Sequence, residues 1–318
     1  MRALVVSNMR PDARNPGRGR FVRDQVDALR RLPDVEVDLF DFPPGAPALA
    51  RAAATLRRRY RARTYDVVHA HFGLSAWPAL GVGARARVLT VHGTDVRHPR
   101  TGQLTRAVLH RMDLVAAPSA ALAAELGATE ARRVAVLPCG VDTTRFRPLD
   151  RRAARTALGL DPQRAYLLFP ADPARSGKRH DLALQAAGAT PLLTLGGVEP
   201  EEVPLWINAA NAVVMPSDAE GFGLAVLEAL ACDVPVLATP VGVHALALGG
   251  LAGALCAPFD ALAWQSVLAP HVQASDPRVR GRARAELFSA TRMAQRVACA
   301  WQALLPGDGA RPSRPERG

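Results

Sequence analysis

Apolar runs and polar, glycine-containing loops alternate along the first part of the chain. Residues 2–8 form a continuous apolar run, as expected of a strand buried on both faces of a parallel sheet. Residues 21–32 place apolar side chains at helical spacing, and residues 35–42 alternate as a strand does. Helical segments separate the further strands that we expect at 66–72, 87–93, 114–119 and 133–140. This regular alternation predicts a doubly wound α/β domain.

The same alternation restarts after residues 140–152, which have no periodicity and read as an interdomain linker. Apolar strands and helical segments then alternate as far as about residue 260, and helices fill roughly 260–305. We therefore predict an α/β protein with two Rossmann-like units in tandem, at residues 1–148 and 149–288, whose facing strand ends form a ligand cleft. The composition of residues 306–318 predicts a disordered tail.

Composition agrees with two ordinary globular domains in a chain of 318 residues, because 49% of them are hydrophobic and 22% charged. The apolar run at the N-terminus is too short for a signal peptide, and no apolar stretch is long enough to cross a bilayer. The four cysteines form no CxxC pair, so we expect reduced thiols. These features predict a cytoplasmic protein.

The formal net charge is +11, and much of it comes from arginine-rich runs. Residues 51–63 combine Leu56 and Tyr60 with six arginines, which is the pattern of a basic helix resting on the anionic inner face of a membrane or of a solvated arginine-rich face. We favour the solvated face. No aromatic platform or nucleic-acid motif accompanies the charge, so no nucleic-acid partner is expected.

Lys178, in the loop "ADPARSGKRHD", is the only lysine among forty basic residues. A second polar loop, within "MPSDAEGFGLAVLEALACDVPVLATPVG" (215–242), carries Glu220 and opens a helix that bears Glu228. Eight residues are a little over two helical turns, so both carboxylates can face one cleft. The amides of residues 221–223 lie at the helix N-terminus, which favours an anion.

The segment 215–242 resembles glycosyltransferase family 4, the retaining enzymes of the GT-B fold. The resemblance rests on two glutamates separated by seven residues, within a pattern of the form "PS…EGFGL..LEA.AC..PV.A". "NPGRGRFVRDQVDAL", "VVHAHFG", "TVHGTD" and "LPCGVDTTRFRP" extend it over nearly the whole chain. The resemblance implies that residues 289–305 form a closing helix that returns to the first domain.

The resemblance also implies the roles of individual residues. Glu228 would bind the ribose hydroxyls of a nucleoside-diphosphate sugar, Glu220 the hydroxyls of the transferred sugar, and Lys178 the diphosphate. The Gly-Arg pair that commonly precedes this lysine is absent, and Arg175 is the expected substitute, as in "PAR..K" loops of a teichuronic-acid-type subset. The remaining donor-binding residues implied by the family are Gly17, Gly221, Phe222, Gly223 and Leu224.

The acceptor side of the cleft is expected to contain residues at strand ends of the first domain. By the same resemblance His92 would contact the donor sugar near its reacting carbon, and the alternative is a structural histidine that is hydrogen-bonded at a strand end. His71 and Gly19 would line the acceptor cleft. Asp95 is expected either to cap a helix or to contact the acceptor. His69 and His71 are expected to face opposite sides of their strand, so no metal site is predicted. For the loop with Gly17 and Gly19, simple flexibility is the alternative.

Together these features predict a metal-independent retaining glycosyltransferase without a cofactor, which moves a hexose-type sugar from a nucleoside diphosphate to a glycan, a lipid-linked or a small-molecule acceptor, as in polysaccharide biosynthesis. The alternatives are a catalytically silent sugar-nucleotide-binding or scaffold protein and a GT-B nucleotide-sugar epimerase. The second domain is short, because "PLLTLGG" is followed directly by "VEPEEVPLWINAAN", where longer family members insert a strand–helix pair.

Overall fold

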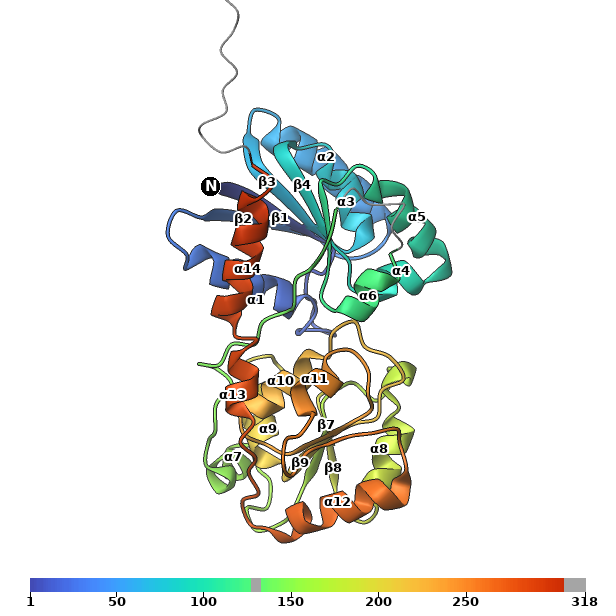
Figure 1. The fold of residues 1–318 in the computed structure, drawn as a ribbon, viewed down its shortest axis with the longest axis vertical. Coiled ribbons are helices and arrows are strands. Elements are labelled where there is room, and N and C mark those ends of the chain that lie inside the picture. Colours follow the sequence, from blue (N-terminus) through green and yellow to red (C-terminus); the bar gives the residue numbers. More distant parts are fainter. Residues whose placement is uncertain (127–132, 306–318) are drawn as a thin grey trace, which may run out of the picture.

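The computed structural model describes residues 1–126 and 133–305 as two α/β units stacked end to end (Figure 1). The first unit contains a fully parallel six-stranded sheet. In spatial order its strands are β2 (Glu36–Asp41), β1 (Arg2–Ser7), β3 (Thr64–His71), β4 (Gly83–Thr90), β5 (Leu114–Ala117) and β6 (Val134–Val136). The helices of the first unit are α1 (Arg20–Arg30), α2 (Ala46–Tyr60), α3 (Gly73–Ala79), α4 (Thr94–Arg97), α5 (Pro99–Leu109) and α6 (Ala120–Ala124).

The second unit repeats this design with a parallel five-stranded sheet. Its strands are, in order, β11 (Leu255–Cys256), β10 (Val236–Ala238), β9 (Ala212–Met215), β7 (Leu167–Phe169) and β8 (Leu192–Thr194). Its helical segments are α7 (Arg151–Ala157), the 3₁₀ turn η1 (Ser176–Lys178), α8 (His180–Ala187), α9 (Val203–Ala209), α10 (Leu224–Ala231), α11 (His244–Leu248), α12 (Ala261–Gln273) and α13 (Arg282–Glu286). The prediction of two doubly wound units is confirmed.

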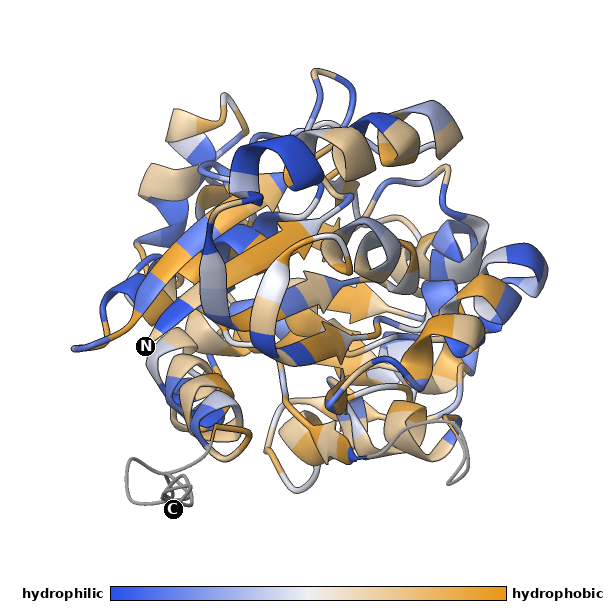
Figure 2. Ribbon diagram, turned by 90° about the horizontal axis from the view of Figure 1, so that it is seen from above, coloured by the Kyte–Doolittle hydropathy of each residue, from blue (hydrophilic) through white to orange (hydrophobic). Residues whose placement is uncertain are grey.

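The strands are apolar because helices cover both faces of each sheet. In Figure 2 the strands are mostly orange, whereas the surrounding helices carry the polar residues. Separate clusters of buried side chains lie on the two faces of each sheet, as expected for parallel sheets. The continuous apolar run predicted at residues 2–8 is accordingly β1, which is buried from its second residue on.

The arginine-rich helix α2 directs its apolar side inward. Leu56 is fully buried and Tyr60 nearly so, in the cluster of apolar side chains on that face of the first sheet, while Arg57, Arg58 and Arg59 are exposed. The apolar residues that a lipid-binding helix would insert are thus part of the core. Within the residues that the structure describes, no helix has the length and apolar character needed to span a bilayer.

The closing helix α14 (Ala290–Gln302) belongs to the second half of the sequence but packs on the first unit. It lies beside α1 in Figure 1, and Trp301 is fully buried among side chains of the first unit. The chain thus crosses between the units twice. The two crossings are joined where the N–H of Val141 donates to the carbonyl of Phe288 and the N–H of Ala290 to that of Val141, at 2.9 and 2.8 Å.

Arg151, at the first turn of α7, ties together three segments of the second unit. Its side chain is 1% exposed, donates to the carbonyls of Ala210 and Pro277 at 3.1 and 3.2 Å, and pairs with Asp276. Burial lowers the pKa of this guanidinium to about 10. The rigid, planar guanidinium presents its N–H groups from separate nitrogens and so reaches all three acceptors, whereas the N–H groups of a lysine share one nitrogen.

We therefore expect Arg151→Lys to lower the free energy of unfolding by about 3 kcal/mol, because the ammonium leaves buried acceptors unpaired. Urea unfolding followed by tryptophan fluorescence measures this change. The matched control is Arg152→Lys, at an exposed neighbouring position, which should change stability by less than about 0.5 kcal/mol. Equal changes in the free energy of unfolding for the two substitutions would contradict a structural role for the guanidinium of Arg151.

Candidate active site

The strand order of each sheet brings chemically active loops together. In each sheet the first strand lies between the second and the third, so the loops that follow the first and third strands diverge at the carboxyl edge and leave a crevice. In the second unit these are the loop after β7, which contains Lys178, and the loop after β9, which contains Glu220. They touch where the N–H of Asp218 donates to the carbonyl of Gly177 at 3.0 Å.

Lys178 and Glu220 form an ion pair at this edge, with Nζ 2.5 Å from Oε1. The lysine side chain is 17% exposed and the glutamate side chain 9%. The hydroxyl of Ser217 donates to the same carboxylate oxygen at 2.9 Å. Glu220 is thus held in place from two directions, and the only lysine of the chain lies at the carboxyl edge of the second sheet.

Three glycines allow the loop after β9 to run between its neighbours. A Cβ on Gly221 would lie 2.3 Å from the carbonyl oxygen of His92 in the other unit. Gly223, with φ +93°, precedes α10 and leaves no room for a Cβ beside the ring of His244. A Cβ on Gly242 would lie 2.3 Å from the carbonyl oxygen of Phe222. The backbone of residues 221–223 is therefore fixed at the start of α10, as expected of an anion-binding helix terminus.

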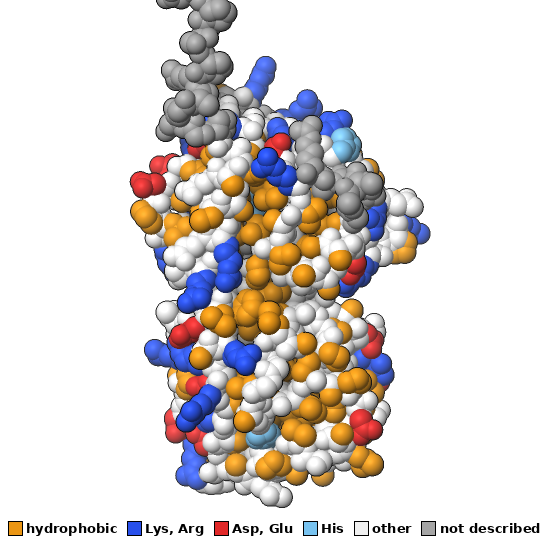
Figure 3. Space-filling model, in the orientation of Figure 1, with side chains coloured by type: hydrophobic (Ala, Val, Ile, Leu, Met, Phe, Trp, Pro, Cys, Tyr) orange, Lys and Arg blue, Asp and Glu red, His pale blue; other side chains and the backbone are white. Residues whose placement is uncertain are grey.

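The two units touch each other at this loop. The hydroxyl of Ser119, after β5, donates to the carbonyl of Gly221 at 3.3 Å. Gly93 and Gly221 approach so closely that a Cβ on Gly93 would be 3.5 Å from the Cα of Gly221. Glu220, on the second unit, is therefore placed next to the strand ends of the first. Figure 3 shows the molecule narrowing where the two units meet.

Glu228 lies one and a half turns into α10 and is partly buried. Its carboxylate makes no hydrogen bond or ion pair to the residues that the structure describes. Desolvation raises its pKa to about 7, and Arg145 is the cation that most opposes this shift. Arg145 belongs to the linker and donates to Asp24 of α1 at 3.1 Å, so these charges come from both units. An unpaired acceptor at such a junction is suited to ligand hydroxyls.

His92 follows β4 and faces the junction beside aromatic rings. The centroid of its ring lies 4.4 Å from that of Phe72 and 4.9 Å from that of Phe21. Its Nε2 lies 3.1 Å from Nδ1 of His71. The structure therefore brings together two histidines that the sequence assigned to the donor and acceptor sides of the cleft.

Asp95 is 6% exposed, and its carboxylate accepts backbone N–H groups from the segments that follow β3 and β4. Oδ1 accepts from His92 and Oδ2 from Gly73, at 2.9 and 3.0 Å. Burial raises the pKa of this carboxyl, and the backbone donors oppose the rise. Both oxygens are occupied, so the geometry favours the structural alternative, although the helix α4 itself begins after Gly93 rather than after Asp95.

The predicted orientation of His69 and His71 is wrong. Their rings stack with centroids 4.6 Å apart, because residues two apart on a strand project to the same face. Both rings are buried and their nitrogens are occupied by hydrogen bonds to neighbouring groups. No group of three His, Cys, Asp or Glu side chains within residues 1–126 and 133–305 is arranged to hold a metal ion.

Other predicted site residues lie at the edges of the site. Arg175 is exposed, and its side chain has no partner within the described parts of the chain. Gly17 is exposed, whereas Gly19 is buried, with φ +65°, and packs on the carbonyl of Met9 at the start of α1. Phe222 is buried against Phe288, and Leu224 is half-buried at the start of α10. Gly19 is thus required by backbone geometry.

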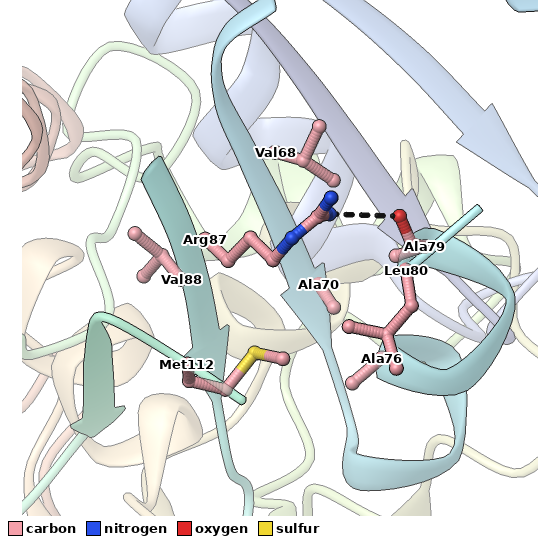
Figure 4. Close-up of a pocket in the computed structure, with 8 residues that line it drawn as sticks. All are labelled: Val68, Ala70, Ala76, Ala79, Leu80, Arg87, Val88 and Met112. Atoms are coloured by element: carbon pink, nitrogen blue, oxygen red, sulfur yellow. Dashed lines mark hydrogen bonds between the residues drawn. The ribbon is translucent and has the colours of Figure 1, made fainter. Parts of the chain in front are cut away.

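Two hollows of the structure are lined by side chains other than those of Lys178, Glu220 and Glu228. The cavity of Figure 4 has a volume of about 10 Å³, room for about one water, and is crossed by the side chain of Arg87. An open depression of about 630 Å³ borders the Lys178 loop, but it is lined by Arg179, Asp181 and Asp218 rather than by Lys178 and Glu220. We assign the site from the charged groups, because their pairing and burial are specific.

Three residues that the structure places at the site belong to no motif that marks them in the sequence. Ser119 bonds to the Gly221 loop, Gln25 bonds to His71, and the buried ring of His244 supports Gly223. Nδ1 of His244 donates to the carbonyl of Thr239 at 2.8 Å, while its Nε2 has no partner among the described residues. Their contacts join residues far apart in sequence, so no local motif marks them.

The burial of Glu228 predicts a specific dependence of stability on pH. The folded protein holds the proton of this carboxyl up to about pH 7, whereas the unfolded carboxyl releases it near pH 4.5. The free energy of unfolding therefore falls as the pH rises from about 4.5 to 7 and stays low above. We expect Glu228→Gln to be more stable than the wild type at pH 8, by about 1–3 kcal/mol.

Urea unfolding at pH 5 and pH 8 tests this expectation, since the gain should shrink at pH 5. Glu199→Gln is the matched control, because Glu199 is exposed and has no ion pair among the described residues. The control should change stability equally at both pH values. A gain from Glu228→Gln that is as large at pH 5 as at pH 8 would show that the carboxyl is already ionised in the folded state.

Family models match both units of the chain. Residues 4–145 match the model of Glycosyltransferase Family 4, and residues 173–269 match that of Glycosyl transferases group 1. A D-inositol 3-phosphate glycosyltransferase of Mycolicibacterium gilvum is 30% identical in an alignment 328 residues long, gaps included. The alignment covers 87% of this chain and 71% of the relative. Its counterpart in Mycolicibacterium paratuberculosis is 29% identical over 301 residues, which cover 78% and 68%.

Solved structures share the two-unit fold. A sucrose-phosphate synthase from Thermosynechococcus elongatus superposes with a TM-score of 0.70 at 19% identity, over 96% of this chain and 99% of that one. HepE from Anabaena, solved in complex with UDP-glucose, gives a TM-score of 0.69 at 16% identity, over 95% and 100%. The expected arrangement of two Rossmann-like units facing each other is thereby confirmed as the GT-B fold.

Proposed function

Because the chain belongs to glycosyltransferase family 4, we propose that this glycosyltransferase transfers a hexose-type sugar from a nucleoside-diphosphate donor, with retention and without a metal ion. The observation that carries this proposal is the ion pair of Lys178 and Glu220 beside the glycine turn that opens α10, with Glu228 further along the same helix and unpaired among the described residues. The Lys178 ammonium would bind the diphosphate of such a donor, the Glu220 carboxylate its sugar and the Glu228 carboxylate its ribose.

We place the diphosphate between the Lys178 ammonium and the N-terminus of α10. Cleavage of the glycosidic bond develops negative charge on the leaving phosphate, and a fixed cation together with a helix terminus stabilises that charge. A metal ion is not needed for this step if the protein supplies the cation. Lys178 is paired with Glu220, so a bound donor phosphate would compete with this carboxylate for the one ammonium.

We assign the sugar to Glu220 and the ribose to Glu228. Glu220 is held by Ser217 and Lys178, which fixes a carboxylate that can accept sugar hydroxyls. Glu228 has no partner among the described residues, so ribose hydroxyls would satisfy it. The complex of HepE with UDP-glucose supports a donor of this class. Arg175 remains our proposal for a second diphosphate contact, which requires its exposed side chain to turn toward the loop.

We place the acceptor on the first unit, near His71, His92 and the loop of Gly17 and Gly19. The relatives named as D-inositol 3-phosphate glycosyltransferases support a small polar acceptor among the alternatives of a glycan and a lipid-linked molecule. For Asp95 we propose that it instead holds the segments after β3 and β4 in place, because its two oxygens accept the backbone N–H groups of Gly73 and His92.

A thermal-shift panel with UDP, GDP, ADP and dTDP, followed by hydrolysis of the matching sugar donors, tests the proposal. Lys178→Ala and Glu228→Ala should each weaken nucleotide diphosphate binding by about tenfold or more, since each removes one charge-assisted contact. Glu220→Ala should leave that binding within about threefold and lower kcat by at least a hundredfold, because it removes a contact to the sugar.

Arg175→Ala shows whether the exposed arginine shares the diphosphate with Lys178. Lys178→Arg separates the need for charge from the need for a compact ammonium, because it keeps the charge and changes its shape. Nucleotide binding without any turnover would favour the catalytically silent binding protein. Release of an epimerised sugar nucleotide would favour the epimerase.

A further inference from the structure

Three histidine rings lie in a row at the ends of β3 and β4, with His69 and His71 buried and His92 partly exposed. His69 and His71 come from β3, and His92 follows β4. The ring centroids of His69 and His71 are 4.6 Å apart and those of His71 and His92 are 5.3 Å apart, with interplanar angles of 24° and 21°. Burial lowers the pKa of His71 to about 3 and the pKa of the other two well below the ordinary value. The rings are therefore neutral, and each carries one proton on one of two nitrogens.

The position of the proton on His69 follows from its partners. The indole N–H of Trp301 can only donate, and it lies 3.3 Å from Nδ1 of His69. Nδ1 is therefore the acceptor, and the proton is on Nε2, which donates to the hydroxyl of Thr90 at 2.7 Å. Both nitrogens of His69 are used, so this ring contacts His71 only by stacking.

The proton on His71 is set by Gln25 of α1. The amide nitrogen of Gln25 lies 3.1 Å from Nε2 of His71, and an amide NH₂ donates but does not accept. Nε2 of His71 is therefore an acceptor, and the proton is on Nδ1. Nδ1 lies 3.1 Å from Nε2 of His92 and donates to it. His92 in turn must carry its proton on Nδ1.

The Nδ1 atom of His92 has no hydrogen-bond partner among the described residues, yet it is not one of the buried polar atoms without a partner. It therefore reaches solvent at the junction where Gly221 touches the carbonyl of His92. An N–H at this point attracts a substrate oxygen, whereas a lone pair would repel it. The tautomer of His92 thus decides whether the ring attracts or repels a bound sugar.

We propose that Gln25 and His71 are positioning residues that hold neutral His92 with its proton on Nδ1, so that the ring presents an N–H donor to an oxygen of the substrate. The role of His92 toward a sugar rests on the proposed function. The chain of donors that fixes its tautomer rests on the hydrogen bonds alone. Free neutral histidine favours the proton on Nε2, so the unusual tautomer needs this support.

Nitrogen-15 NMR of protein labelled at histidine reads the tautomer without any substrate. The signals of His92 are identified by their loss in His92→Phe. In the wild type we expect Nδ1 of His92 to carry the proton. In Gln25→Leu, which keeps the size but removes the donor, the proton should move largely to Nε2. Gln25→Lys keeps a donor that cannot accept, and it should preserve the wild-type tautomer.

Kinetics with a sugar-nucleotide donor tests the functional half of the proposal. Gln25→Leu should lower kcat at least tenfold and leave KM for the donor within about threefold, and Gln25→Lys should restore most of kcat. The matched control is Gln265→Leu, because Gln265 is exposed on α12 and its amide bonds only the carbonyl of Gln185. That substitution should change neither the tautomer nor kcat.

The outcomes separate the two proposals. A proton on Nε2 of His92 in the wild type, or a tautomer that Gln25→Leu leaves unchanged, would overturn the inference. A shifted tautomer with unaltered kcat would overturn the role of the N–H. If the wild type shows the expected tautomer but transfers and hydrolyses no sugar nucleotide, the proposed function fails and the positioning of His92 stands.

Discussion

The backbone hydrogen bonds that join the interdomain linker to the start of α14 are the constraint on which the rest of the structure depends. Val141 is hydrogen-bonded in both directions to Phe288 and Ala290, so the linker and the start of α14 leave the second unit side by side. Gly140 makes this approach possible, since a Cβ there would lie 2.8 Å from the Cα of Ala290. With α14 packed on the first unit, the carboxyl edges of the two sheets remain opposed, and the loop of Gly221 meets the carbonyl of His92.

The chain uses arginine to hold its architecture and its single lysine at the candidate site. Arg282 bonds the carbonyls of Thr143, Phe146 and Ala231, and so connects the linker to the end of α10. Such multiple donation suits a planar guanidinium, whereas a compact ammonium is suited to one strong contact. The arginine-rich composition therefore has a structural meaning, because many of these charges bind carbonyl groups of the same chain.

Much of the fold could be predicted from the sequence because strands buried on both faces, such as β1 and β9, are apolar runs between polar loops. The ends of such strands place Lys178 and Glu220 at one edge of the second sheet, and Glu228 follows on the helix that begins there. The orientation of His69 and His71 was predicted wrongly, because residues two apart on a strand project to the same face and not to opposite faces. Gln25 and Ser119 could not have been found, because their significance lies in contacts with residues that only the fold brings near.

Because Lys178 is the only lysine of the chain, its chemical modification can be followed without interference from other side chains. Apart from the terminal amine, reagents that modify primary amines have one target, and it is the residue that is paired with Glu220. A protonated amine in an ion pair is a poor nucleophile, so the rate of acylation at Lys178 reports how tightly the pair is held. A lysine-specific protease likewise has one site, between η1 and α8, and its rate of cleavage reports how often that loop opens.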